Sequence, residues 1–180
     1  VNRAKLSAQN VNLPLKDHFV HGNLFDTPGE IYVTKYAALL ITMNADPAKE
    51  AVAIAQNYFA LQADKQQLED EKRLRSRFDV ATENRLLQGV AQDHGVENFQ
   101  RFNGVGLSAL YGGRNQDQVK TMKGLPPTAV LLDHAGSEEL AANLFRITQT
   151  SAALRRQEGR SETAATETHR RVSADVRKLI

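Results

Sequence analysis

The chain has 180 residues, 41% of them hydrophobic, and a net charge of +2 from 23 Lys and Arg against 21 Asp and Glu. That charge is too small to indicate nucleic-acid binding by itself, and the lack of cysteine excludes disulfides, thiolate zinc sites and thiol catalysis. The longest apolar run, residues 36–41, is far shorter than the roughly 20 residues that span a bilayer.

A β-hairpin is the first expected element, within residues 18–34. Residues 18–20 and 30–33 are β-prone, and the turn former Pro28-Gly29 separates them. Thr34 is placed to cap a helix that runs to about residue 44. A hairpin beside short helices is compatible with part of a winged-helix-like module, although many small α+β modules share that layout.

A long helical region follows, from the start signal Asp46-Pro47 to about Asp93. Good helix formers dominate it, and a helix over its whole length would measure roughly 70 Å, so it must break, project or pack on another chain. The apolar stripe thins out in residues 63–77, where Glu69 and Arg73 are spaced for i,i+4 pairing. We therefore expect residues 63–77 to be a helical connector between two domains.

The next segment is rich in glycine. Gly95 is suited to end the helical region in a left-handed conformation. Residues 103–113 contain four glycines but complete no phosphate-binding motif, and are interpreted as backbone turns. Asn115 and Gln118 form a plausible capping box for a short helix that ends near Gly124.

Two amphipathic helices are expected to complete the chain. Ser137 is predicted to cap the first, which runs to about residue 158. The second begins at Ser161 and places His169, Val172 and Val176 on one apolar stripe. Because such a stripe needs a partner, these three residues are predicted to form the seam of a homodimer.

The residues suggest no active site. None of the five histidines has a nucleophile or a set of metal ligands at motif spacing (His18, His21, His94, His134 and His169). A convergent polar pocket around Asp133 and His134 would be the sign of an overlooked enzyme. The acidic residues at 64–71 alternate with lysine and arginine, as on a solvated, ion-paired helix face. We expect a non-enzymatic protein without metal or cofactor.

Basic residues gather toward the end of the sequence. Residues 141–180 hold eight basic residues against four acidic ones. We predict phosphate contacts from seven of the eight: Arg155, Arg156, Arg160, Arg170, Arg171, Arg177 and Lys178. A merely solvated helix face remains the simpler alternative. No aromatic residue follows Phe145, so base stacking on this part of the chain is poorly supported.

Three blocks of the sequence, in order, resemble the bacterial DNA-damage-inducible protein D family. They are residues 35–50 with 55–62, the short Leu110-Tyr-Gly-Gly113, and residues 132–150. The resemblance implies a partial Bro-N type module at the start, with further sequence preceding it in the family. It also implies a cytoplasmic, nucleoid-associated SOS-response protein that binds DNA or acts on recombinase–DNA filaments.

Together these observations predict a mainly α-helical protein with a hairpin-containing, winged-helix-like N-terminal module. The expected domains are residues 1–62, the connector 63–77 and a helical domain 78–180. Two further functional classes stay open. One is a protein-interaction module without DNA contact, which an uncharged, apolar exposed groove along the helix from Ser137 would favour. The other is a transcriptional regulator of the phage antirepressor kind.

Overall fold

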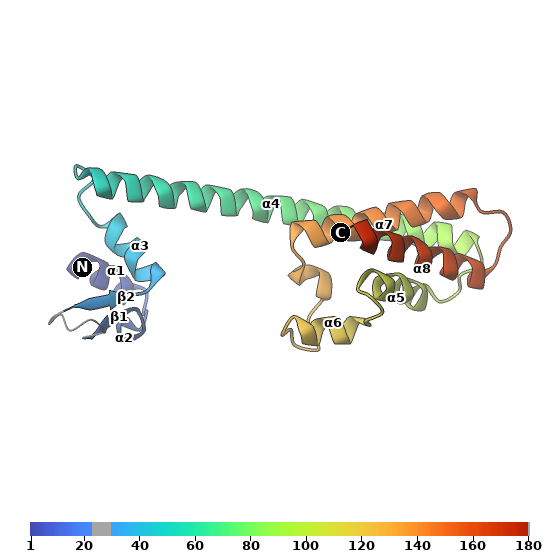
Figure 1. Ribbon diagram of the computed structural model, residues 1–180, viewed down its shortest axis with the longest axis horizontal. Helices are drawn as coiled ribbons and strands as arrows, with labels where there is room; N and C mark the ends of the chain where they lie inside the picture. The colour runs from blue at the N-terminus through green and yellow to red at the C-terminus, as the bar shows by residue number, and fades with distance from the viewer. Residues whose placement is uncertain (23–29, 180) are drawn as a thin grey trace. The chain divides into compact units, whose positions relative to one another are not determined.

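The computed structural model describes residues 1–22 and 30–179. Its helices and strands confirm a mainly α protein with one β-hairpin (Figure 1). In chain order they are α1 (Asn2–Asn10), α2 (Leu15–His18), β1 (Phe19–His21), β2 (Ile31–Val33), α3 (Lys35–Met43), α4 (Glu50–Asp93), α5 (Phe99–Leu110), α6 (Gln116–Met122), the 3-10 helix η1 (Leu131–His134), α7 (Ser137–Arg156) and α8 (Glu162–Leu179). The chain forms two compact units, Val1–Gln67 and Leu68–Ile180.

The first unit packs three helices around the hairpin. β1 and β2 are antiparallel, with Phe19 opposite Val33. Phe19 is buried against Ala4 of α1 and Ala37 of α3. The predicted Thr34 cap is confirmed, because its hydroxyl accepts a hydrogen bond from the backbone N–H of Ala37 at 3.3 Å. The predicted Pro28-Gly29 turn lies outside the described residues, and the assignment to a winged-helix-like Bro-N module stays a prediction.

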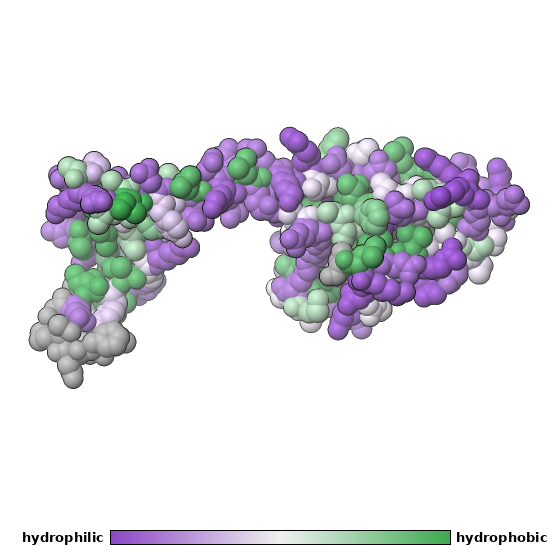
Figure 2. Space-filling model, turned by 45° about the horizontal axis from the view of Figure 1, so that its top comes forward, coloured by the Kyte–Doolittle hydropathy of each residue, from purple (hydrophilic) through white to green (hydrophobic). Residues whose placement is uncertain are grey.

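Helix α4 is continuous over 44 residues, which corresponds to about 66 Å at 1.5 Å per residue. It begins at Glu50, because Asp46 accepts from the Ala48 N–H at 3.0 Å and so caps a turn before the helix. Residues 63–77 lie within α4, and the boundary between the two compact units also falls there. The surface of this stretch is mostly hydrophilic, with isolated apolar side chains (Figure 2).

The second unit has a core shared by four helices. The end of α4 contributes Val80 and Leu87, α5 contributes Phe102, and α7 contributes Leu140 and Ile147. Ala165 on α8 completes this cluster, and α8 packs against both α5 and α7 (Figure 1). The predicted left-handed Gly95 after α4 is confirmed by its φ of +85°.

The interpretation of residues 103–113 as backbone turns is wrong for most of the segment. Helix α5 continues to Leu110 with Gly104 and Gly106 inside it, and left-handed glycines begin only at Gly112. Gly106 is required by packing, since an added Cβ would lie 1.9 Å from Nε2 of the buried His169. The Asn115–Gln118 capping box is confirmed, with both reciprocal hydrogen bonds at 2.9 Å.

Two expectations for the last helices need correction. Gly136, not Ser137, is the residue before α7, and Ser137 is a buried first residue of the helix without a capping hydrogen bond. The predicted dimer seam faces the interior of the same chain: His169 is fully buried, and Val176 packs on Leu110. Val172, on the same stripe, is half-buried. The apolar stripe of α8 is thus covered by α5 and α7, and it is not available to a second copy.

Membrane-spanning helices and metal-binding clusters are both absent from the described residues. No helix in residues 1–22 and 30–179 has both the length and the apolar character needed to cross a membrane. No group of three or more His, Asp or Glu side chains in the same ranges is arranged to hold a metal ion.

Candidate nucleic-acid interface

The basic residues of α8 project from the side of the helix that does not pack on the core. His169, Ser173 and Val176 face inward and are buried, whereas Arg170 and Lys178 are exposed. This division follows from the helical period, because residues that lie three, four or seven apart share a face. A helix that is held on one side by the core therefore presents its cations on the other.

A groove of about 830 Å³ runs between α5 and α8 and reaches the start of α6. Four basic side chains line it: Arg101, Arg170, Arg177 and Lys178. Asp117 is the one acidic side chain among the lining residues of the described chain. Three of the seven predicted phosphate contacts thus converge in one groove, together with an arginine from α5.

Small residues form part of the α5 side of this groove, beside Gln100, Arg101 and Val105. Gly104, Ser108 and Ala109 come from the helix, and Gly112 and Gly113 follow it. A Cβ added at Gly104 or Gly113 would meet no atom within 4 Å. Because these positions carry little or no side chain, a bulky chain such as a phosphodiester backbone can approach closely.

Acidic neighbours on α8 orient two of the cations. The Arg170 guanidinium donates to Glu167 at 2.6 and 2.8 Å, and Lys178 pairs with Asp175 at 2.9 Å. These hydrogen bonds lower the pKa of both carboxyl groups and raise the pKa of Arg170. All four groups are exposed, so the pairs are screened by solvent and can exchange for a phosphate.

Arg177 has a structural task as well. Its guanidinium donates to the backbone carbonyl of Leu110 at 2.9 Å and so closes the last turn of α5. Gly112, with φ +70°, lies so close that an added Cβ would be 3.0 Å from this guanidinium. Arg177 consequently fixes α8 to the end of α5 and also contributes its charge to the groove.

The other four predicted contacts do not line the groove. Arg155 and Arg156 end α7, Arg160 lies in the following turn, and Arg171 occupies another stripe of α8. The Arg156 side chain donates to the Ala152 carbonyl, and within the described chain no hydrogen bond or ion pair engages the side chains of Arg155, Arg160 or Arg171. The sequence analysis did not identify Arg101, because residues 103–113 just after it were interpreted as turns and no helix was predicted around it.

Beneath α8 lies a buried polar cluster around Arg146. Arg146 is 1% exposed, and it donates to Nε2 of His169 at 3.1 Å. Since arginine can only donate, this nitrogen of His169 must accept, and Nδ1–H donates to the Thr150 hydroxyl at 2.8 Å. Burial, followed by the charge of Arg146, lowers the pKa of His169 to about 3, so the imidazole is neutral. The Phe102 ring stacks on it at 4.4 Å.

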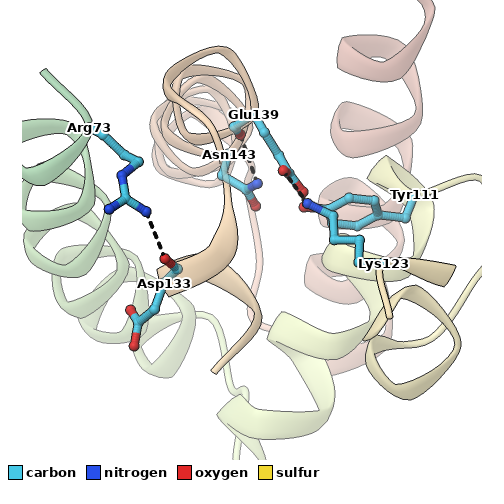
Figure 3. Close-up of polar contacts among 6 residues, drawn as sticks. All are labelled: Arg73, Tyr111, Lys123, Asp133, Glu139 and Asn143. Atoms are coloured by element: carbon cyan, nitrogen blue, oxygen red, sulfur yellow. Dashed lines mark hydrogen bonds and ion pairs between the residues drawn. The ribbon is translucent and has the colours of Figure 1, made fainter. Parts of the chain in front are cut away.

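Glu139 joins three elements at the start of α7 (Figure 3). Its carboxylate accepts from the Tyr111 hydroxyl and from Lys123 Nζ, the latter at 2.5 Å, and its backbone carbonyl accepts from Asn143. Burial, together with the hydrogen bond to Glu139, raises the pKa of Tyr111 well above its usual value. This network holds α5, α6 and α7 together and so supports one end of the groove.

Asp133 is engaged by arginines of α4. Its backbone carbonyl accepts from Arg73 at 3.0 Å (Figure 3). Its carboxylate pairs with Arg77 at 2.7 Å. The neighbouring His134 is exposed, and the described structure gives it no hydrogen bond to Asp133. Asp133 therefore ties η1 to α4 and does not orient an imidazole there.

A second, more apolar groove of about 730 Å³ follows α7. Ala141, Ala142 and Phe145 line it from α7, and Val176 and Leu179 line it from α8. The side chains of Phe145 and Leu179 are 46% and 76% exposed. Apolar surface patches interrupt the charged surface of this unit (Figure 2). Glu138, Glu139 and Arg177 also line the groove, which is thus mainly apolar without being uncharged.

Comparison with known proteins agrees with the resemblance seen in the sequence. Residues 67–180 match the DinD C-terminal domain family. The chain is also 37% identical to the DNA damage-inducible protein D of Escherichia coli (strain K12) in an alignment 201 positions long, which covers 100% of this chain and 73% of that protein. The family match begins within the stretch of α4 where the two compact units divide.

Proposed function

The chain belongs to the DinD family of DNA-damage-response proteins, and we propose that it binds DNA phosphates in the α5–α8 groove. We propose further that it acts without enzymatic chemistry. One observation carries the proposal. Arg101, Arg170 and Lys178, from two helices far apart in the sequence, line one groove with a small-residue wall. Lysine and arginine contacts of this kind provide affinity that depends on phosphate charge.

The lining residues also favour a mode of recognition. No aromatic side chain lines the groove within the described chain, so stacking on unpaired bases receives no support there. Phosphate contacts fix a protein on its nucleic acid but carry little sequence information. We therefore propose binding with weak sequence preference. Such contacts need only an accessible backbone, so recombinase–DNA filaments are included among the proposed targets.

The test is fluorescence anisotropy of the full chain with single- and double-stranded oligonucleotides over a salt series. A variant with Arg101→Ala, Arg170→Ala and Lys178→Ala is compared with one carrying Arg155→Ala, Arg160→Ala and Arg171→Ala. Both lose three positive charges, but only the first loses them from the groove.

We expect the groove variant to lower the slope of log K against log salt by about 2–3, since each phosphate contact contributes roughly 0.7–0.9. The control variant keeps most of the slope. Equal losses in both variants would mean that net charge, and not the groove, drives binding. An absence of binding at low salt would refute the proposal for this chain.

The predicted homodimer is proposed to form along α4, because the stripe of α8 is internal. Ile54, Tyr58, Leu61 and Leu68 are each more than half exposed, and their spacings of four, three and seven fit a coiled-coil seam. Light scattering on Leu61→Glu, with the neighbouring Gln62→Glu as control, tests this. We expect the first variant to be monomeric and the second dimeric. A monomeric unmodified chain would refute the dimer.

A second candidate function is the docking of a protein partner in the apolar groove along α7. The exposed Phe145 and Leu179 favour it, because clustered apolar side chains on a surface often mark an interaction site. A purified bacterial recombinase, free of DNA, serves as the probe in calorimetry. Binding that is lost in Phe145→Glu but kept in the α5–α8 groove variant would favour docking over phosphate contact.

A further inference from the structure

The guanidinium of Arg146 is a buried positive charge that meets only neutral partners. It donates to Oδ1 of Asn143 at 3.1 Å, to Nε2 of His169 at 3.1 Å and to Oδ1 of Asn103 at 3.3 Å. Burial lowers its pKa to about 10, so it remains a cation at neutral pH. Within the described chain no carboxylate forms an ion pair with it. Buried charges are costly unless a counter-charge lies nearby, so an anion close to Arg146 would be stabilised.

A cavity of about 370 Å³ opens directly onto this guanidinium, between α4, α5, α7 and the segment before η1. Arg77 and Arg85 line it from α4, so three cations surround one space. No Asp or Glu is among its lining residues in the described part of the chain. The ion pair of Arg77 with Asp133 offsets one of these charges. Arg85 is exposed, and no ion pair in the described structure involves it.

The remaining polar groups of the cavity call for a ligand that also donates a hydrogen bond. Oδ1 of Asn84, which lines the cavity, is buried without a hydrogen-bond partner. Gln116 and Asn103 add two more side-chain amides, of which Asn103 already accepts from Arg146, and apart from the arginines the other lining residues are apolar. Leaving a buried acceptor unpaired is unfavourable, so a hydroxyl or N–H group at this place would be stabilised.

We propose that this cavity binds a small phosphorylated ligand, with its phosphate between Arg146 and Arg85 and a donor group of the ligand on Asn84. Arginine suits phosphate because its planar fork donates two hydrogen bonds at once. The volume falls in the range of small-molecule pockets, roughly 300–1,000 Å³, and admits a mononucleotide. The site shares no lining residue with the α5–α8 groove except Gln116, and it functions independently of DNA binding there.

Calorimetry of the full chain tests the site with three probes: inorganic phosphate, deoxyadenosine monophosphate and deoxyadenosine. We expect saturable binding of the monophosphate at one site per chain and no binding of the nucleoside. Comparable affinity for inorganic phosphate would assign the cavity to the phosphate group alone. Binding of the nucleoside as tightly as the monophosphate, or no heat from either phosphate, would overturn the proposal.

Two variants on the same helix locate the binding. Arg85→Ala removes the exposed cation at the cavity and is expected to weaken binding of the monophosphate at least about tenfold, as for one lost hydrogen bond to a charged group. Arg75→Ala, also exposed on α4 but outside the cavity, leaves the affinity unchanged. Equal affinity in both variants would refute this location. The variant with Arg101→Ala, Arg170→Ala and Lys178→Ala is expected to keep ligand binding. Failure of the DNA-binding proposal is therefore distinguishable from failure of the ligand proposal.

Discussion

The two faces of α8 both carry polar residues, but these residues have different roles on each face. On the inner face His169 and Ser173 are fully buried, and each must find its hydrogen-bond partner within the chain. On the outer face Arg170 and Lys178 are exposed, and their ion pairs with neighbouring carboxylates are screened by water. Burial therefore decides the role of a polar side chain on α8: a buried one specifies the fold, and an exposed one is available to a ligand.

Among single substitutions, Gly106→Ala is expected to disturb the packing of the inner face of α8 most. The new methyl group would overlap the His169 imidazole, so we expect a loss of about 3 kcal/mol in the free energy of unfolding, measured by urea titration. Gly104→Ala, on the same helix with open space around it, is the matched control. It is expected to stabilise the protein by about 0.5–1 kcal/mol, because alanine favours the helix. Equal effects of the two substitutions would contradict the packing assigned to His169.

The dependence of stability on pH is a second test of the inner face of α8. The pKa of His169 is lowered from 6.5 to about 3 in the folded chain, so the unfolded chain binds the extra proton between these values. Stability therefore falls as the pH drops below 6.5, by about 2 kcal/mol between pH 7.5 and pH 5. Urea titrations at several pH values measure it. The glutamine of His169→Gln cannot titrate, so this loss of stability at low pH should be absent from that variant. If its stability depends on pH as strongly as before, other groups cause the loss.

The hydrogen-bond network at Glu139 is half-buried, so its effect on stability should lie between those of the buried and the exposed face of α8. Tyr111→Phe removes one hydrogen bond to this carboxylate and leaves its ion pair with Lys123. We expect a loss of about 1 kcal/mol in the free energy of unfolding, determined by thermal or urea denaturation. If Tyr111→Phe lowered the free energy of unfolding as much as Gly106→Ala, the network would be as important to the fold as the buried core.

The smallest effect on stability is expected on the outer face. Arg170→Ala with Lys178→Ala breaks two exposed ion pairs, and the unfolding midpoint should not change measurably. The same variant should nevertheless weaken binding to DNA, as anisotropy at low salt would detect. A clear drop in the unfolding midpoint would contradict this prediction, because it would mean that the exposed ion pairs also stabilise the fold.

Local signals in the sequence predicted the parts of the fold that depend on neighbours along the chain. The cap at Thr34 and the box of Asn115 with Gln118 are formed by residues three apart, and both are present. The helix through residues 103–110 was not predictable in this way. Gly106 is needed because His169, 63 positions later, occupies the space of its side chain, and no local pattern records that contact.

The candidate site was predictable only in part, for the same reason. The helical period correctly separates Arg170 and Lys178 from the apolar stripe of α8. It could not reveal Arg101, which joins them from α5, or exclude Arg155 and Arg160 from the groove. A count of charges also places Arg146 with the surface cations, although it is the largest fully buried side chain of the described chain.

The close approach of Gly106 to His169 has an evolutionary consequence. Two positions that share one volume cannot vary independently, so a relative that acquires alanine at position 106 must carry a smaller side chain at position 169. That smaller residue removes a hydrogen bond from Arg146, which would then be free to change in its turn. Positions 106, 146 and 169 should therefore be inherited as a group among such proteins, and substitutions should enter this trio together.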